Sequence, residues 1–268
     1  MPKKKSKKFS ETITGKSLIF LAKSPIYFYR GIKRLRKIMN QRKSEKIILK
    51  KRGLIGARYE VFKILKTEKG DFNEWEKDVF DSDSKIGVII GARGQGKTAF
   101  GIKFLENIYA KKKKKCYAMG FKREEMPLWI NVIENIKYLG NNAFVLIDEG
   151  GILFSSRSSM SNANKLLSEL ILISRHKNLS ILFISQNSSN LDVNILRQAD
   201  FLVLKSSSLL QKDFERKIIQ KIYDATEKDF EKFRDKKGLT YIYGNLFRGF
   251  VTNPLPSFWG EKISKGFE

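Results

Sequence analysis

Two residue types that build redox and metal sites are almost absent from this sequence. The 268 residues include one cysteine, Cys116, and one histidine, His176. A lone cysteine cannot form a disulfide within the chain, and a lone histidine excludes a metal site built from several histidines. We therefore expect Cys116 to be a small buried residue on a strand and His176 to be structural.

Long apolar runs are also missing. The most apolar early segment, residues 17–29, is interrupted by Lys23 and Pro25, and it is shorter than the roughly 20 residues that span a bilayer. Residues 1–8 are followed by polar residues rather than by an apolar core, so no secretory signal is expected. These features predict a cytoplasmic protein, in the host cytoplasm if the protein is viral, with peripheral contact at the inner membrane face as an alternative.

Acidic residues are few relative to basic ones. The chain has 28 Asp and Glu against 53 Lys and Arg, a net charge of +25. The first 60 residues hold 19 basic and three acidic residues, so +16 of that charge lies there. A field of this size attracts polyanions, which predicts nucleic acid or an anionic membrane surface as partner. The 41% hydrophobic content is sufficient for a real core and excludes disorder along the whole chain.

The pattern of residue types divides the chain into four parts. Residues 1–16 are expected to be a disordered basic tail. Residues 17–84 are expected to be one or two basic amphipathic helices, up to residue 66, and then an acidic connector with a short helix around Trp75. Residues 85–225 carry an alternation of strands and helices, and residues 226–268 are expected to hold a helix, a hairpin and a docking tail.

The alternation predicts an α/β fold with a doubly wound, mostly parallel sheet. Short apolar strands are expected at residues 85–90, 116–121, 143–147, 180–184 and 201–204. Helices are expected at residues 98–111, 126–139, 163–174, 190–198, 209–223 and 227–235. A β-hairpin is expected from residues 239–243 and 246–251, joined at Gly244 and Asn245.

A glycine-rich loop follows the first of these strands and has the pattern G-x-x-x-x-G-K-[ST]. Its glycines allow the backbone to turn several N–H groups inward as an anion-binding nest, and the next helix adds its positive N-terminal dipole. The lysine reaches the β- and γ-phosphates and the threonine hydroxyl ligates Mg²⁺. The loop therefore predicts ATP and Mg²⁺ as cofactors. The residues expected to bind ATP are Gly91, Ala92, Arg93, Gly94, Gln95, Gly96, Lys97, Thr98 and Ala99.

Two further strands end in polar residues suited to ATP hydrolysis. The third strand runs into Asp148 and Glu149, which places two carboxylates at the carboxyl edge of a parallel sheet. We expect Asp148 to hold Mg²⁺ together with Thr98, and Glu149 to orient and deprotonate the attacking water. Gln186 ends the fourth strand, where its amide can sense the γ-phosphate.

The order of these motifs resembles the FtsK–HerA superfamily of P-loop ATPases. The resemblance covers about residues 85–205 and is closest to zonula-occludens-toxin-like and viral genome-packaging ATPases. Its other elements are Ser174-Arg175-His176 at the end of a helix, the strand ending in Gln186, and then Asp192, Arg197 and Asp200. The resemblance implies a RecA-like fold and a ring, usually hexameric, that threads DNA. It also makes Gln186 the polar sensor and Arg175 the first candidate for an arginine finger, with Arg197 second and Arg157 weaker.

These features together predict an ATPase that couples hydrolysis to movement of DNA, in a translocase or genome-packaging motor of a virus or mobile element. The predicted partners are double-stranded DNA and further copies of the chain in a ring. Residues 155–162 could form a channel loop or an ordinary solvent loop. One alternative is a membrane-associated assembly or secretion ATPase, with residues 17–38 as an interfacial helix and membrane or capsid contact through the N-terminal region. Another is a DNA-binding nucleotide switch, against which the intact Asp148–Glu149 pair argues.

Overall fold

The computed structural model describes residues 52–149 and 160–260, Ile263, and scattered positions between residues 29 and 50. The chain divides into two compact units, Met1–Leu54 and Ile55–Glu268, and the fold described here is that of the second. The predicted basic tail, most of the predicted N-terminal helices and residues 155–159, including Arg157, lie outside the described residues.

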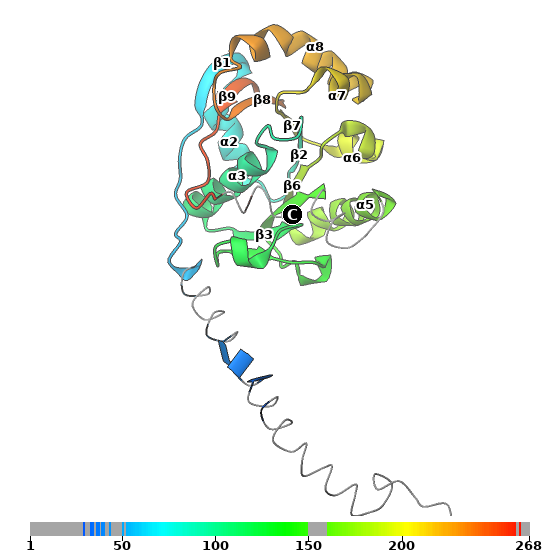
Figure 1. Ribbon diagram of the computed structural model, residues 1–268. Helices are drawn as coiled ribbons and strands as arrows, with labels where there is room; N and C mark the ends of the chain where they lie inside the picture. Colours follow the sequence, from blue (N-terminus) through cyan, green and yellow to red (C-terminus); the bar gives the residue numbers. More distant parts are fainter. Residues whose placement is uncertain are drawn as a thin grey trace, which may run out of the picture. The chain divides into compact units, whose positions relative to one another are not determined.

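Helices and strands alternate along the second unit (Figure 1). The strands are β1 (Lys63–Gly70), β2 (Ile86–Ile90), β3 (Lys115–Met119), β4 (Ile130–Val132), β5 (Ala143–Asp148), β6 (Leu179–Ile184), β7 (Phe201–Leu204), β8 (Leu239–Gly244) and β9 (Phe247–Thr252). The α-helices are α2 (Phe72–Asp81), α3 (Lys97–Lys112), α5 (Met160–Lys177), α6 (Val193–Gln198), α7 (Leu209–Phe214) and α8 (Lys217–Lys232). Short 3₁₀ helices are η2 (Arg123–Glu125), η3 (Ile136–Tyr138) and η4 (Ser188–Asn190).

Within the described residues the strands form one nine-stranded sheet in the order β1-β9-β8-β7-β2-β6-β5-β3-β4. The pairs from β7 to β4 are parallel, and those among β1, β9, β8 and β7 are antiparallel. The strands β2, β5 and β6 are buried along their whole length, as expected of parallel strands that helices cover on both faces. The predicted doubly wound, mostly parallel sheet with a C-terminal hairpin is confirmed.

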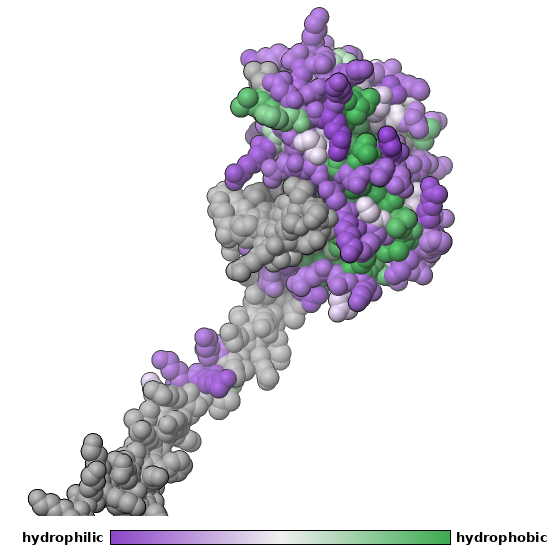
Figure 2. All heavy atoms as spheres, turned by 90° about the vertical axis from the view of Figure 1, so that its right-hand side faces the viewer, coloured by the Kyte–Doolittle hydropathy of each residue, from purple (hydrophilic) through white to green (hydrophobic). Residues whose placement is uncertain are grey.

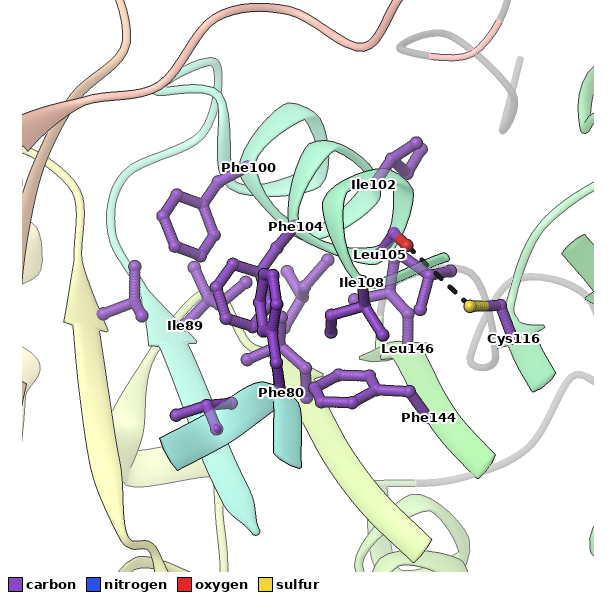
Figure 3. Close-up of a cluster of buried hydrophobic side chains, with 14 of the residues drawn as sticks. Phe80, Ile89, Phe100, Ile102, Phe104, Leu105, Ile108, Cys116, Phe144 and Leu146 are labelled. Atoms are coloured by element: carbon purple, nitrogen blue, oxygen red, sulfur yellow. Dashed lines mark hydrogen bonds between the residues drawn. The ribbon is translucent and has the colours of Figure 1, made fainter. Parts of the chain in front are cut away.

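Alternate side chains of the buried strands enter two separate cores. Ile89 and Leu146 pack on one face of the sheet with side chains of α2 and α3, whereas Val88 and Val145 pack on the other face with α5, α6 and α8. Figure 3 shows the first core, in which the Phe100 and Phe104 rings of α3 stack with centroids 5.7 Å apart. The helix that follows the glycine loop is thereby fixed against the sheet.

Cys116 lies in this first core, as predicted. Its side chain is fully buried on β3, and its thiol lies 3.8 Å from the Leu105 carbonyl oxygen (Figure 3). Burial raises the pKa of the Cys116 thiol. The residue is therefore a packing residue rather than a reactive thiol.

The helix predicted over residues 126–139 is wrong. This segment holds β4, which pairs in parallel with β3, and the short helix η3. The buried Ile130 and Val132 flank an exposed Asn131, which is the period of a strand rather than that of a helix. The apolar residues that suggested a helix therefore add a strand to the edge of the sheet.

The prediction of helices up to residue 66 is wrong for the last residues of that range. Lys63–Gly70 forms β1, an edge strand that pairs antiparallel with β9. Its lysines are typical of edge strands, where charge discourages pairing with another chain. The predicted short helix around Trp75 is confirmed as α2, but it is a core element rather than a connector: Asp71 caps its first turn, and Phe72 and Trp75 are buried.

The boundary between the two C-terminal helices lies at a different place from the predicted one. The break lies at Glu215 and Arg216, between α7 and α8, and α8 continues through residues 223–227. The Arg216 N–H donates to Ser188 Oγ at 2.9 Å, which fixes the break against the segment after β6. None of the described helices is both long and apolar enough to span a membrane.

Candidate nucleotide site

The glycine loop connects β2 to α3 at the carboxyl edge of the sheet. Gly94 and Gly96 have φ values of 81° and 80°, in the left-handed region that glycine adopts without strain. Gly96 is the N-cap residue of α3 and offers no side chain there. A helix N-terminus preceded by left-handed turns directs its N–H groups at an anion, so the loop fits a polyphosphate.

Lys97 opens α3 and is buried within the loop. Its Nζ donates to the carbonyl oxygens of Gly91 at 2.6 Å and Ala92 at 2.9 Å. Burial lowers the pKa of Lys97, while the carboxylates of Asp148, Glu215 and Glu149 act in the opposite direction. The ammonium thus sits under the loop, in reach of phosphates that the loop would bind.

Thr98 and Asp148 bring together the two oxygen ligands expected for Mg²⁺. Thr98 Oγ1 donates to Asp148 Oδ2 at 3.2 Å, although the two residues come from α3 and from the end of β5. The structure shows no cluster of three or more His, Cys, Asp or Glu among the described residues that could hold a metal alone. A hydroxyl and one carboxylate suit Mg²⁺, which is usually held by one or two carboxylates, substrate phosphates and water.

Glu149 is the buried carboxylate of the site, with 3% of its surface exposed. Ser185 Oγ, at the tip of β6, donates to Glu149 Oε2 at 2.6 Å. Burial raises the pKa of Glu149, and the hydrogen bonds from Ser185 and from the Gln186 backbone counter part of that effect. One carboxylate oxygen is thus fixed by β6, and the carboxylate is positioned as a base beside Asp148.

The Gln186 backbone lies beside Glu149, to which it donates a hydrogen bond. The Gln186 side chain is exposed. The Gln186 carbonyl oxygen accepts from Gln211 Nε2, which also donates to Glu215 Oε1 at 3.0 Å. Glu215 is buried and accepts from the Ser188 N–H at 2.6 Å. The exposed Gln186 amide is free to meet a ligand, and the start of α7 is tied to the tip of β6.

Sequence reasoning missed Ser185, Glu215 and Lys205 as residues of this region. Lys205 directly follows β7, is fully buried, and donates from Nζ to Asn253 Oδ1 at 2.7 Å. Ser185 directly precedes the predicted Gln186, so the same strand-end argument could have found it. Glu215 lies in a segment predicted as continuous helix, and Lys205 is one of 53 basic residues. For these two only the tertiary structure supplies a signal.

The candidate arginine fingers lie at the opposite edge of the sheet. Arg175 is in the last turn of α5, just before β6, and Arg197 is in the last turn of α6, just before β7. Both line a cavity of about 580 Å³. The six-residue strand β6 separates this amino edge from Ser185 by about 20 Å, so neither arginine can reach phosphates on its own glycine loop.

Comparison with known families shows which family the chain belongs to. The sequence profile of the zonular occludens toxin (Zot) family matches residues 101–238, about half of the chain. The chain belongs to the Zot family. With its glycine loop and sheet topology, this Zot-family member is a P-loop NTPase. No curated protein sequence matches the chain.

Several solved structures are similar to the Zot-family chain. The DNA-packaging ATPase B204 from Sulfolobus Turreted Icosahedral Virus is 16% identical, with a TM-score of 0.43, over 65% of this chain and 99% of that one. The genome packaging NTPase B204 from Sulfolobus turreted icosahedral virus 2, in complex with ATP-gammaS, is 14% identical with a TM-score of 0.47 over the same shares. The pCW3 conjugation coupling protein TcpA is 12% identical, with a TM-score of 0.45, over 69% of this chain and 64% of that one.

Proposed function

We propose that this Zot-family chain hydrolyses ATP and couples hydrolysis to movement of double-stranded DNA, as a motor of a virus or mobile element. The observation that carries the ATPase assignment is the buried Glu149, which Ser185 holds at 2.6 Å beside the Thr98–Asp148 pair. A site that only bound nucleotide would not need a buried carboxylate fixed in this way. A positioned base of this kind is what ATP hydrolysis requires.

Each residue of the site has a distinct task in this proposal. The loop N–H groups and Lys97 would bind the phosphates, and Thr98 and Asp148 would hold Mg²⁺, which would neutralise charge on the phosphates. Glu149 accepts a proton from the attacking water, and the hydrogen bond from Ser185 holds the Glu149 carboxylate in position. The exposed amide of Gln186 would contact the terminal phosphate.

A ring of identical subunits completes the site in this proposal. Arg175 and Arg197 lie too far from their own glycine loop to act there, so each would serve the loop of a neighbouring copy. The face that carries α5 to α8 shows apolar side chains among polar ones (Figure 2). Exposed apolar residues there are Leu172, Leu210, Phe214 and Ile218. Ile218 lines the same cavity as the two arginines, so apolar surface adjoins them on the face that we propose meets a neighbouring copy.

DNA is the proposed polyanionic partner because of the charge distribution. The excess of +16 in the first 60 residues would bind phosphates of any sequence. The same charge supports a second candidate, a membrane-associated assembly or secretion ATPase at the inner membrane face, because basic segments also bind anionic lipid. We favour DNA for this segment and a cytoplasmic location for the protein.

The test is an ATPase assay of the full chain with and without double-stranded DNA, together with a mass measurement of the assembly. We expect Mg²⁺-dependent hydrolysis that DNA stimulates, in an assembly several times heavier than the 31.0 kDa chain. Absence of hydrolysis would refute the ATPase assignment. Hydrolysis that DNA leaves unchanged but anionic vesicles stimulate would support the membrane-associated alternative instead.

A further inference from the structure

A third buried carboxylate lies near the glycine loop and has no task in the proposed reaction. Glu215 is buried at the break between α7 and α8. Burial lowers the pKa of Lys97, and the charges of Asp148, Glu215 and Glu149, in that order, act against this effect. Glu215 is therefore within electrostatic reach of the lysine that would bind the phosphates.

The Glu215 carboxylate binds the segment that directly follows β6. Its Oε2 accepts from the Ser188 N–H at 2.6 Å, and its Oε1 accepts from Gln211 Nε2 at 3.0 Å. The same Gln211 Nε2 donates to the Gln186 carbonyl oxygen. Glu215 therefore fixes the chain on both sides of Asn187, directly at residue 188 and through Gln211 at residue 186.

Ser188 is the fixed end of this segment. It is fully buried, and its polar groups all bind the break between α7 and α8. The Arg216 N–H donates to Ser188 Oγ at 2.9 Å, and Arg216 Nε donates to the Ser188 carbonyl oxygen at 3.0 Å. With the bond from the Ser188 N–H to Glu215, its N–H, hydroxyl and carbonyl groups each have a partner at that break.

The other end of the segment carries the contacts to the base. Ser185 Oγ donates to Glu149 Oε2 at 2.6 Å, and the Gln186 N–H donates to the same carboxylate. Residues 185–188 thus form a turn between two buried carboxylates, Glu149 at its start and Glu215 at its end. Because the turn is short, a shift at the Glu215 end displaces the groups that hold Glu149.

The position requires a side chain that only accepts hydrogen bonds. Gln211 Nε2 and the Ser188 N–H are both donors, and a carboxylate offers an acceptor oxygen to each. A glutamine in place of Glu215 would bring its NH₂ group against one of these donors. Turning the Gln211 amide to relieve that contact would remove its bond to the Gln186 carbonyl oxygen.

A role in ending α7 does not explain the acidic side chain. Burying a negative charge is costly unless the charge is paired, and this site already holds Asp148 and Glu149. A residue that only ended the helix would not need to be acidic. The carboxylate is explained if its bonds to the turn are what the site requires.

We propose that Glu215 is a positioning residue for hydrolysis. It holds residues 185–188 in the conformation in which Ser185 is bonded to Glu149. The same conformation keeps the Gln186 amide where it would contact the terminal phosphate. The proposal rests on the proposed function, ATP hydrolysis, and adds to it a residue from the break between α7 and α8 that acts through the turn rather than on ATP itself.

The first test compares turnover with binding in Glu215→Gln. The amide keeps the size of the side chain but cannot accept from both donors, so we expect kcat for ATP hydrolysis by the full chain to fall about 10–100-fold. KM for ATP should change much less, and affinity for ADP, which lacks the terminal phosphate, should stay unchanged. The matched control is Asp213→Asn, at an exposed aspartate of α7, which should keep the wild-type kcat.

The second test asks whether Glu215 acts through Gln211. Gln211→Met keeps the length of the side chain and removes its donor to the Gln186 carbonyl oxygen, so kcat should also fall. Residues that act through one shared contact have effects that do not add. The double variant Glu215→Gln/Gln211→Met should therefore be no slower than the slower of the two single variants.

The outcomes separate positioning from stability. Ile242→Val shortens a fully buried side chain of β8 and should lower the urea midpoint of unfolding without lowering kcat. The positioning role is refuted if Glu215→Gln keeps the wild-type kcat or loses ADP binding as well. It is also refuted if the two single losses in kcat add fully in the double variant, or if Ile242→Val loses as much kcat as Glu215→Gln.

The outcomes also separate this proposal from the proposed function. If Glu149→Gln is inactive while Glu215→Gln is fully active, the proposed function stands and only the role of Glu215 fails. If the wild-type chain does not hydrolyse ATP, the proposed function itself fails, and the role of Glu215 fails with it.

Discussion

The two edges of the parallel sheet differ in how far their charged side chains are buried and paired. At the carboxyl edge, Lys97, Asp148 and Glu149 are buried, and each has close partners within the chain. At the amino edge, Arg175 and Arg197 are exposed, and within the described part of the chain neither has an ion-pair partner. Burying charge is costly unless the charges are paired, so the carboxyl edge is built for a ligand. In our proposal, the two exposed arginines of the amino edge serve a neighbouring copy of the chain.

The largest expected effect is a loss of hydrolysis when the amino edge is changed. Arg175→Ala should bind ATP nearly as the wild type does and hydrolyse it about 10³–10⁵-fold more slowly, the range typical of an arginine finger. Mixing Arg175→Ala with Lys97→Ala subunits should restore part of the activity, because each variant supplies what the other lacks. Hydrolysis is measured as phosphate release, and binding with a fluorescent ATP analogue.

Arg197→Ala serves as the matched variant, because the two arginines line one cavity. The variant with the larger loss of turnover at unchanged binding identifies the finger. If a dilute monomer is fully active and neither substitution slows it, the amino edge has no part in hydrolysis and the shared site is refuted.

The next effect concerns the carboxyl edge alone. Glu149→Gln keeps the shape of the side chain and removes its basicity, so ATP binding should persist while turnover falls about 10²–10⁴-fold. Lys97→Ala should instead abolish binding. Mixing these two variants should restore nothing, since neither then offers a complete loop together with a base. Wild-type turnover in Glu149→Gln would show that the base lies elsewhere.

A third prediction tests whether the second unit is sufficient for catalysis. Removing residues 1–54, the first compact unit, takes away most of the basic excess and no residue of the nucleotide site, so basal hydrolysis should survive. If the removed segment contacts DNA phosphates, affinity for any duplex should fall. The slope of log K against log salt should flatten by about 0.9 for each lost contact.

The measurement is a salt titration of duplex binding, with binding to anionic vesicles measured alongside. Loss of vesicle binding with unchanged DNA binding would favour the membrane-associated alternative. Unchanged binding to both would contradict both uses of the basic segment and indicate a protein-docking arm.

The contrast between the edges also shows what a sequence can predict. The glycine loop and the Asp148–Glu149 pair could be predicted because each is a run of consecutive residues that directly follows an apolar strand. The sheet around them was visible because β2, β5 and β6 are short uninterrupted apolar runs. Such local patterns specify both the element and its place at the carboxyl edge.

What escaped prediction depends on contacts between distant segments. β1 joins the sheet through β9, almost 200 residues later in the chain, and its charged sequence matches neither a buried strand nor a helix. Lys205 was hidden because burial of a lysine depends on acceptors from residues 238–240 and Asn253, which no local pattern reveals. The helix expected at residues 126–139 failed because Ile130 and Val132 are buried through their pairing with β3, a contact that the local sequence does not show.

The smallest expected effect is a change in how the free energy of unfolding depends on pH, caused by Lys205 at the carboxyl edge. It measures the cost of burying a charge at that edge. Burial lowers the pKa of Lys205 to about 7, from 10.5. At a pH between about 7 and 10.5, Lys205 is protonated in the unfolded chain and deprotonated in the folded chain. The unfolded state then binds more protons, so the free energy of unfolding should rise with pH, by at most about 1.4 kcal/mol per pH unit from this residue. Below about pH 7 both states are protonated and the contribution should be flat.

Lys205→Met removes this titration, so the comparison is between two slopes rather than two stabilities. Urea unfolding of the wild type and the variant is followed from about pH 6 to about pH 9, and the wild-type curve should rise more steeply above about pH 7. Groups that titrate in both proteins cancel in the difference, and Lys236→Met, at an exposed lysine, should keep the wild-type slope. Parallel curves for wild type and Lys205→Met would mean that the four oxygens around Nζ keep the ammonium charged throughout. The carboxyl edge would then carry its buried charge by hydrogen bonding alone.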